Sequence, residues 1–121
     1  ADAAALVEHG YRVYLFQYRD KLARYLGVDL AEPFSVARLL VRFQKLFREE
    51  AEMHSRGESV IVSHAGSYLQ QFSATPIPVE IEQSLTAAWA ALAAYSNPGV
   101  SMKQTASVAK GDGRMEWTFS V

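Results

Sequence analysis

The sequence contains no cysteine. That absence excludes disulfide bonds, metal–thiolate clusters and a cysteine nucleophile, and it leaves the redox compartment undetermined, so a cytoplasmic location is the default expectation. Histidine is also scarce. The three histidines, His9, His54 and His64, show none of the spacings of zinc-binding motifs, such as two histidines one helical turn apart. The sequence therefore predicts no metal site and no cofactor.

An excess of positive charge is missing as well. Lysine and arginine number 12 against 13 aspartates and glutamates, which gives a formal net charge of −1. Neutralising a run of phosphates needs clustered basic residues, so we expect no nucleic-acid partner. No stretch approaches the roughly 20 apolar residues that cross a bilayer, because Arg19, Asp20 and Lys21 soon follow the apolar run 13–16. We expect a soluble chain without a membrane partner.

What the chain does have is enough apolar material for one core. It is 121 residues long and 50% hydrophobic, which predicts a single α+β domain over residues 1–121. The first residue is not methionine and the last residue falls inside a strand pattern. Both features are what a chain truncated at either end would show.

The first predicted element is a helix that ends near Gly27, because apolar residues recur at three- and four-residue steps. These residues are Val7, Tyr11, Tyr14, Leu15, Tyr18, Leu22 and Leu26. The other side of this helix carries Leu6, Val13, Phe16 and Tyr25. A helix that is apolar on two sides packs on both, which would place one side on the core and the other on a partner. The alternative is a strand over residues 11–18, which are rich in strand-favouring types.

Two more helices are expected. One follows Pro33, with Ser35 as its N-cap and Gly57 at its end. The other lies between Pro78 and Asn97. The second helix also carries a charged stripe, which either docks an acidic partner or, more simply, forms a solvated surface. The stripe consists of Arg38, Arg42, Lys45, Arg48, Glu49 and Glu50.

The remaining segments predict strands. Residues 59–64 form one, and residues 67–72 either continue it or pair back onto it. Residues 100–109 and 114–121 alternate in polarity around Lys110-Gly111-Asp112-Gly113, which predicts a C-terminal β-hairpin. The Gly-Asp-Gly run is assigned to a tight turn rather than to a phosphate loop, because no helix start follows it. The element order predicts an antiparallel sheet packed against about three helices.

Side-chain alternation in the hairpin predicts which residues point inward. On the last strand these are Met115, Trp117, Phe119 and Val121. On the preceding strand the polar Gln104 falls among the inward-facing residues. Its amide needs partners, so Gln104 either lines a pocket or lies at the margin of the sheet.

The stretch from Trp89 through Asn97-Pro98-Gly99 to Gly111-Asp112-Gly113-Arg114-Met115-Glu116-Trp117-Thr118-Phe119 resembles the end of bacterial domains of the 4-vinyl-reductase-like and heme-NO-binding-associated class. The resemblance covers the last third of the chain. It implies a compact α+β domain, commonly a dimer, that binds a small apolar molecule or serves as a regulatory or scaffolding module. Where those domains often carry cysteine near the last strands, this chain has Met115.

Three functions from different classes follow. The leading hypothesis is a non-catalytic regulatory or interaction domain that self-associates as a homodimer through the first helix. Its predicted interface consists of Tyr11, Tyr14, Phe16 and Tyr18. Besides the homodimer, the hypothesis allows a different protein or a small apolar ligand as partner.

The second hypothesis is a small-molecule sensor with an aromatic pocket. Its predicted ligand-binding residues are His64, Tyr68, Trp89, Gln104 and Trp117. The third is a small hydrolase or isomerase that uses His64 as a base, with Glu58 or Glu80 as the nearby acid. Because Ser63 and His64 are adjacent on a strand and point to opposite faces, they do not form a dyad, and no catalytic residue is assigned.

Overall fold

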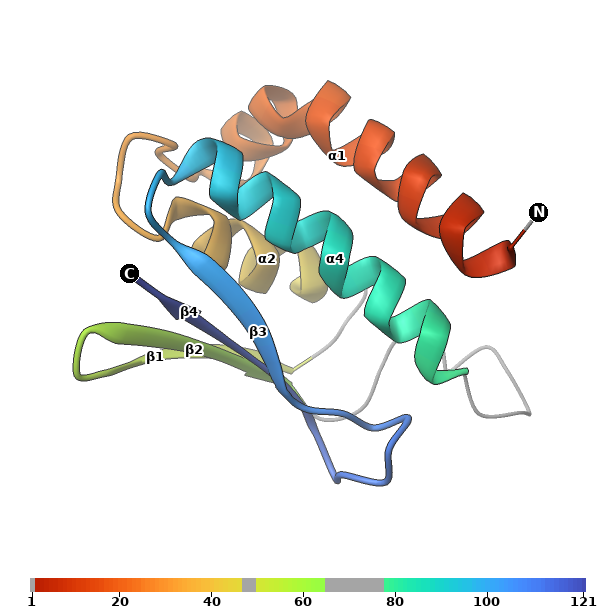
Figure 1. Cartoon of the computed structure of the whole chain (residues 1–121). Helices are drawn as coiled ribbons and strands as arrows, with labels where there is room; N and C mark the ends of the chain where they lie inside the picture. The colour runs from red at the N-terminus through yellow and green to blue at the C-terminus, as the bar shows by residue number, and fades with distance from the viewer. Residues whose placement is uncertain (1, 47–49, 65–77) are drawn as a thin grey trace.

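The fold is α+β, with one antiparallel sheet that ends in a C-terminal hairpin, as the sequence predicts (Figure 1). The computed structural model describes residues 2–46, 50–64 and 78–121. Within these ranges the helices are α1 (Ala3–Leu26), α2 (Ser35–Lys45) and α4 (Val79–Ser96). The strands are β1 (Ala51–Arg56), β2 (Ser59–His64), β3 (Ser101–Ala106) and β4 (Met115–Ser120), which lie in the order β1-β2-β4-β3.

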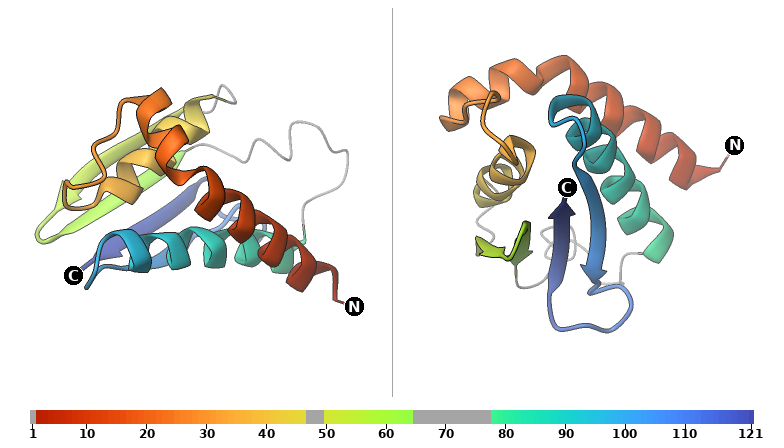
Figure 2. Two further views of the ribbon diagram at one scale, coloured as in Figure 1. Left: turned by 90° about the horizontal axis from the view of Figure 1, so that it is seen from above. Right: turned by 60° about the vertical axis from the view of Figure 1, so that its left-hand side comes forward.

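The elements form three layers (Figure 2). Helices α2 and α4 share one face of the sheet, α2 over β1 and β2 and α4 over β3, and α1 lies across both helices on the side away from the sheet. The core fills the space between these layers. Its largest fully buried side chains include Leu15, Leu39, Leu40, Leu92 and Phe119, which come from all three layers. None of the helices in the described part of the chain is long and apolar enough to cross a membrane.

Helix α1 confirms the predicted first helix, and the alternative of a strand over residues 11–18 is wrong. At its start the Asp2 side chain accepts a hydrogen bond from the Ala4 N–H at 3.0 Å. At its end Gly27 adopts a φ of +71°, and the Val28 N–H reaches back to the Ala23 carbonyl at 2.8 Å. The helix wins over the strand because both ends are capped and because Leu15 and Ala23 are buried on one side of it.

Helix α2 begins differently from the prediction. Ser35 is not its N-cap: Phe34 holds that position with a φ of +58°, and it makes no side-chain capping bond. Asn97, at the end of α4, replaces the cap. Its Oδ1 accepts from the Val36 N–H at 3.2 Å, and its Nδ2 donates to the Ser35 Oγ at 2.9 Å. The start of α2 is thus joined to the end of α4 inside the protein, because both Ser35 and Asn97 are buried.

Strand β1 lies where the sequence predicts the end of a helix. Gly57 does not terminate α2. It forms, with a φ of +60°, the first position of the two-residue turn between β1 and β2, a place that type II′ turns reserve for glycine. The short segment Ala51–Arg56 has few apolar residues, and pairing with β2 decides its conformation. The predicted strand at 59–64 is confirmed, and residues 67–72 lie outside the described residues.

The C-terminal hairpin is confirmed, with two corrections. Met115, Trp117 and Phe119 are buried as expected, whereas Val121 is 84% exposed. The connection is also longer than a tight turn: it runs over residues 107–114 and follows a bulge in β3. Asp112 closes this loop, because its Oδ2 accepts from the Ser107 N–H at 2.8 Å and its own N–H donates to the Ser107 carbonyl at 2.9 Å.

Replacing Asn97 tests the joint between α2 and α4. Asn97→Ala leaves the Val36 N–H and the Ser35 hydroxyl buried without their partner, so we expect a loss of about 3 kcal/mol in the free energy of unfolding. Urea denaturation monitored by circular dichroism measures it. The control Ser101→Ala, at an exposed site, should change stability by less than about 0.5 kcal/mol. Equal effects of the two substitutions would contradict the role given to Asn97.

Two glycines give a matched test of the end of α1. Gly27→Ala places a Cβ in a left-handed conformation and 3.1 Å from the Arg42 Nη1, so we expect a loss of about 1–2 kcal/mol. Gly113→Ala meets nothing within 4 Å and has no positive φ, so its stability should stay within about 0.5 kcal/mol of the parent. Thermal denaturation of both variants distinguishes backbone strain from a general effect of removing a glycine.

Candidate functional site

A polar network links α4 to the sheet and contains two of the predicted ligand-binding residues. Gln104 on β3 and Trp117 on β4 lie directly opposite each other in the register. The Trp117 Nε1–H donates to the Thr86 Oγ1 at 3.0 Å, and the Thr86 hydroxyl donates to the Gln104 Oε1 at 3.3 Å. The structure therefore brings Gln104 and Trp117 together at a single threonine of α4.

Glu82 completes this network, although it is not among the site residues predicted from the sequence. Its carboxylate lies in the first turn of α4 and the residue is only 7% exposed. The Gln104 Nε2 donates to one oxygen of Glu82, and the Ala109 N–H donates to the other at 3.1 Å. The positive end of the helix dipole adds to these donors. The sequence gives one indication of this role for Glu82: it is an acidic residue in the first turn of a predicted helix, on the same side as the apolar stripe.

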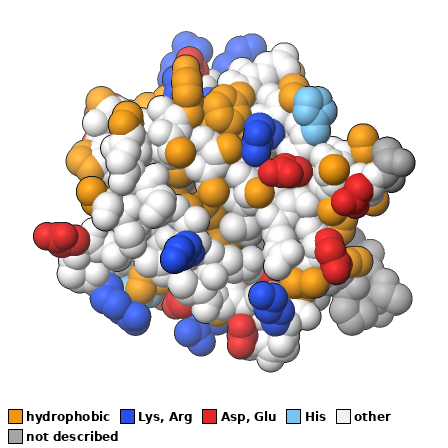
Figure 3. All heavy atoms as spheres, viewed as in Figure 1, with side chains coloured by type: hydrophobic (Ala, Val, Ile, Leu, Met, Phe, Trp, Pro, Cys, Tyr) orange, Lys and Arg blue, Asp and Glu red, His pale blue; other side chains and the backbone are white. Residues whose placement is uncertain are grey.

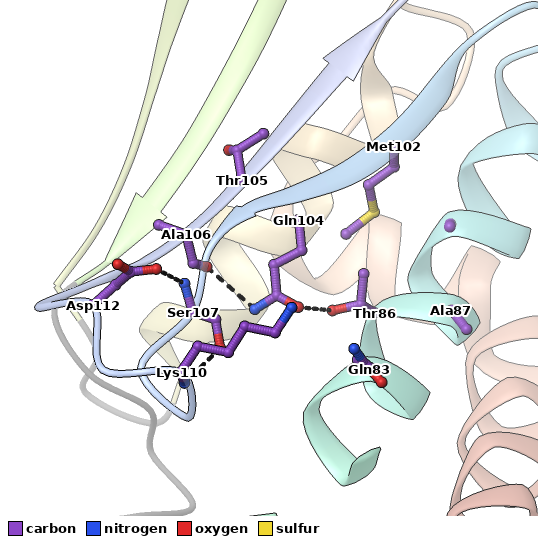
Figure 4. A pocket seen from close by; sticks show the side chains of 11 residues that line it. Gln83, Thr86, Ala87, Met102, Gln104, Thr105, Ala106, Ser107, Lys110 and Asp112 are labelled. Carbon is purple, nitrogen blue, oxygen red and sulfur yellow. Dashed lines mark hydrogen bonds between the residues drawn. The ribbon is translucent and has the colours of Figure 1, made fainter. Parts of the chain in front are cut away.

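An open depression lies beside the network, between α4, β3 and the 107–114 loop (Figure 4). Its volume is about 390 Å³. Figure 4 shows Gln104, Thr86 and the Lys110 side chain directed into it. Gln83, Asp112 and the apolar Met102 also line it, so its lining is as polar as it is apolar. Such a surface offers hydrogen bonds to a small polar group more readily than it encloses an apolar one.

The other predicted ligand-binding residues lie elsewhere. Trp89 is 4% exposed and packs edge-on against Phe43, with 5.4 Å between the ring centroids, so it belongs to the core. His64 ends β2, opposite Ala51 and Met115 in the register. Its side chain and the whole of Tyr68 lie outside the described residues.

Of the two acids predicted beside His64, the topology excludes Glu58. Glu58 lies in the β1–β2 turn, at the opposite end of β2 from His64. Six steps along a strand separate them by roughly 20 Å, so Glu58 cannot act with His64. Glu80 lies in the first turn of α4. Within the described ranges, no three His, Asp or Glu side chains are grouped closely enough to hold a metal ion.

A second candidate site is the outer surface of α1. Of the nine large hydrophobic residues that are exposed within residues 2–46, 50–64 and 78–121, six belong to this helix: Leu6, Val13, Tyr14, Phe16, Tyr18 and Tyr25. Figure 3 shows hydrophobic side chains at the surface over the top of the molecule, where Figure 1 places α1. Because α1 is the outermost layer, its inner side alone is covered by α2 and α4.

The four predicted interface residues divide between two flanks of α1. The rings of Tyr11, Tyr14 and Tyr18 lie in a row along one flank. The ring centroids of Tyr11 and Tyr14 are 6.3 Å apart, and those of Tyr14 and Tyr18 are 5.2 Å apart. Phe16 lies about 200° around the helix from Tyr14. Its ring packs against that of Tyr95 on α4, with 5.3 Å between the ring centroids. The two groups therefore do not form one patch.

We call the first of these surfaces the tyrosine flank. It is a shallow depression of about 490 Å³ on one side of α1, and its lining is mainly apolar. It is lined by Tyr14, Tyr18, Lys21, Leu22 and Tyr25. The sequence prediction that Tyr25 lies on the side of the helix opposite Tyr18 is wrong. Tyr25 follows Tyr18 by seven residues, which returns it to the same face, and it is 78% exposed.

The comparisons with known proteins give the fold alone. No protein-family model and no curated protein sequence matches the chain. Among solved structures, the chain is similar to a trafficking protein particle complex subunit 3 from Naegleria fowleri, covalently bound to palmitic acid. The TM-score is 0.67 at 12% sequence identity, and the match covers 97% of this chain and 78% of that one.

Thr86 gives a test of the polar network. Thr86→Val removes the hydroxyl that joins Trp117 to Gln104 and leaves the buried Trp117 indole N–H without this acceptor, so we expect a loss of about 1–3 kcal/mol in stability. We also expect a shift in tryptophan emission. Thr86→Ser keeps the hydroxyl and should keep most of the stability. Urea denaturation followed by fluorescence measures both, and equal stabilities would contradict the network.

Proposed function

We propose that this protein is a non-catalytic interaction domain that self-associates through the tyrosine flank of α1. The observation that supports this proposal is the exposure of Tyr14, Tyr18 and Tyr25 along one side of the outermost helix. Exposed aromatic side chains that line one face of a helix, with a charged residue beside them, are the kind of surface that protein contacts cover.

The chemistry of the flank suits a protein interface. Tyrosine is enriched in interface cores, because a rigid ring buries much area at a small entropic cost and its hydroxyl can remain hydrated. Lys21 lies at the rim of the flank, with its ammonium 6.0 Å from the centroid of the Tyr18 ring. Polar groups at the rim around an aromatic centre are typical of interfaces.

A two-fold symmetric dimer follows most simply from this geometry. Helix α1 has 24 residues, so it is about 36 Å long. In a symmetric pair the same patch of each copy meets its equivalent, and two such helices packed side by side would cover each other's tyrosines. No further element of the fold has to move.

Two similarities support an assembly role. The structural neighbour is a subunit of a trafficking protein particle complex, which is a protein that works within an assembly. The resemblance of residues 89–119 to the 4-vinyl-reductase-like and heme-NO-binding-associated class implies a regulatory or scaffolding module, commonly dimeric. We propose the assembly role for this chain as well, because the exposed surface of α1 is sufficient for it.

Binding of a small apolar ligand is the second candidate, and the palmitic acid on the structural neighbour favours it. The palmitic acid of that neighbour is covalently bound, whereas this chain contains no cysteine thiol that an acyl group could join. We therefore propose noncovalent binding for any apolar ligand. Stabilisation by palmitate of the protein's thermal unfolding, with a change in tryptophan fluorescence, would support this candidate.

Sedimentation equilibrium from 1 to several hundred micromolar, on the order of typical dimer affinities, tests the proposed self-association. We expect the parent chain to dimerise in this range and Tyr14→Ser/Tyr18→Ser/Tyr25→Ser to stay monomeric, because the substitutions remove the rings of the flank.

The matched control is Tyr95→Ser, which removes a tyrosine that is 65% exposed on α4, outside the flank. It should dimerise like the parent chain. A parent chain that is monomeric at all concentrations would contradict the proposal. A control variant that loses the dimer while the triple variant keeps it would move the interface to the surface around Tyr95.

A further inference from the structure

Strand β1 forms an open edge of the sheet. The strand order β1-β2-β4-β3 leaves β1 with β2 on one side and, within the described part of the chain, no strand on the other. An edge strand carries a row of N–H and C=O groups that another extended chain can pair with. Glu52 and residues 54–56 are exposed along this strand, whereas Met53 is half-buried and Ala51 is buried.

The register shows which backbone groups face outward. Arg56 and Ser59 flank the two-residue turn, so they form the first hydrogen-bonded pair of the hairpin. In an antiparallel pair, the N–H and C=O groups of successive residues point alternately toward and away from the neighbouring strand. The backbone groups of His54, two residues before Arg56, therefore also point toward β2. Met53 and Ser55 direct theirs to the open side.

A row of basic side chains on α2 borders this edge. Arg38, Arg42 and Lys45 follow at steps of four and three residues, so they lie on one face of the helix. Together with Val41 they line a groove of about 440 Å³, whose other wall is Ala51, Glu52, Met53 and His54 of β1. Three basic residues of α2 thus border the groove, while Glu32 pairs with Arg38 and Glu52 lies in the β1 wall.

The cations are held in different ways. The Arg42 Nη1 donates to the carbonyls of Leu26 and Gly27 at 2.6 and 2.8 Å, which fixes its guanidinium at the end of α1 while keeping its charge. Arg38 lies 3.5 Å from Glu32 and is 40% exposed. Lys45 is exposed. An incoming anion can therefore reach the exposed Lys45 directly, and it would share Arg38 with Glu32.

We propose that this groove binds an extended, acidic segment of a partner protein, which adds to the sheet as a strand beside β1. The backbone of the segment pairs with the outward groups of Met53 and Ser55, and its carboxylates face the basic row of α2.

A protein segment fits this site better than a phosphate group. A phosphate would satisfy the cations, but it has no N–H donors for the outward carbonyls of the strand edge. An extended peptide supplies donors, acceptors and carboxylates at once. The groove is separate from the tyrosine flank, so this interaction does not depend on the proposed self-association.

The probe is a fluorescein-labelled nonapeptide of alternating glutamate and threonine, titrated with the full chain and followed by fluorescence anisotropy at low salt. We expect saturable binding that weakens as salt is added. The same peptide with lysine in place of glutamate should not bind. The same peptide with every backbone nitrogen methylated keeps its charge but cannot donate ladder bonds, and it should bind at least about tenfold more weakly.

Variants of the protein test the two halves of the groove. Arg38→Gln/Lys45→Gln should weaken peptide binding about tenfold or more, whereas Lys103→Gln, at an exposed lysine of the opposite edge strand β3, should not change it. Ser55→Pro removes one outward N–H and should weaken binding, while Ser55→Ala keeps that N–H and should not. Circular dichroism shows whether each variant is folded.

Two results would overturn the proposal. Equal binding of the N-methylated and unmodified peptides would show that charge alone attracts them. Displacement of the peptide by inorganic phosphate or by phosphatidylserine vesicles at matched ionic strength would assign the basic row to phosphate groups instead. Because the peptide controls use the unaltered protein, the test stands even where a variant fails to fold.

Discussion

The burial of α2 and α4 between two layers is the constraint on which the rest of the structure depends. Both helices have the sheet on one side and α1 on the other, and Ser35 at the start of α2 and Asn97 at the end of α4 are buried. The hydrogen bonds of Asn97 with the Val36 N–H and the Ser35 hydroxyl give the polar groups at the buried start of α2 their partners. Because the same bonds join the end of α4 to α2, they also fix how the two helices lie on the sheet.

Local patterns in the sequence predicted α1, α4 and the C-terminal hairpin, because their periodicity and caps are visible within each segment. Strand β1 could not be found that way: its residues are mostly polar, and pairing with β2 creates its conformation. The cap on α2 comes from 61 residues away and carries no local mark. Among the site residues, Gln104 was recognised as a polar exception on an inward face, whereas its partner Glu82 was not.

The layers also decide where function can lie. The Glu82, Gln104, Thr86 and Trp117 bonds tie α4 to the hairpin, so these polar groups hold the fold together. Two surfaces that the described layers leave uncovered are the tyrosine flank on the outside of α1 and the basic groove at the edge strand β1. We propose the first, which is aromatic, as the contact between two copies and the second, which is basic, as the site for an acidic chain. Both fit a domain that assembles with other proteins.

Hydroxyl-radical footprinting of the unaltered chain, in dilute and in concentrated solution, tests the central claim most directly, because it reports the exposure of each tyrosine separately. The account predicts that Tyr14, Tyr18 and Tyr25 become less reactive in concentrated solution, while Tyr95, which is exposed on α4, keeps its reactivity. Unchanged reactivity of all four tyrosines, or protection of Tyr95 alone, would contradict it.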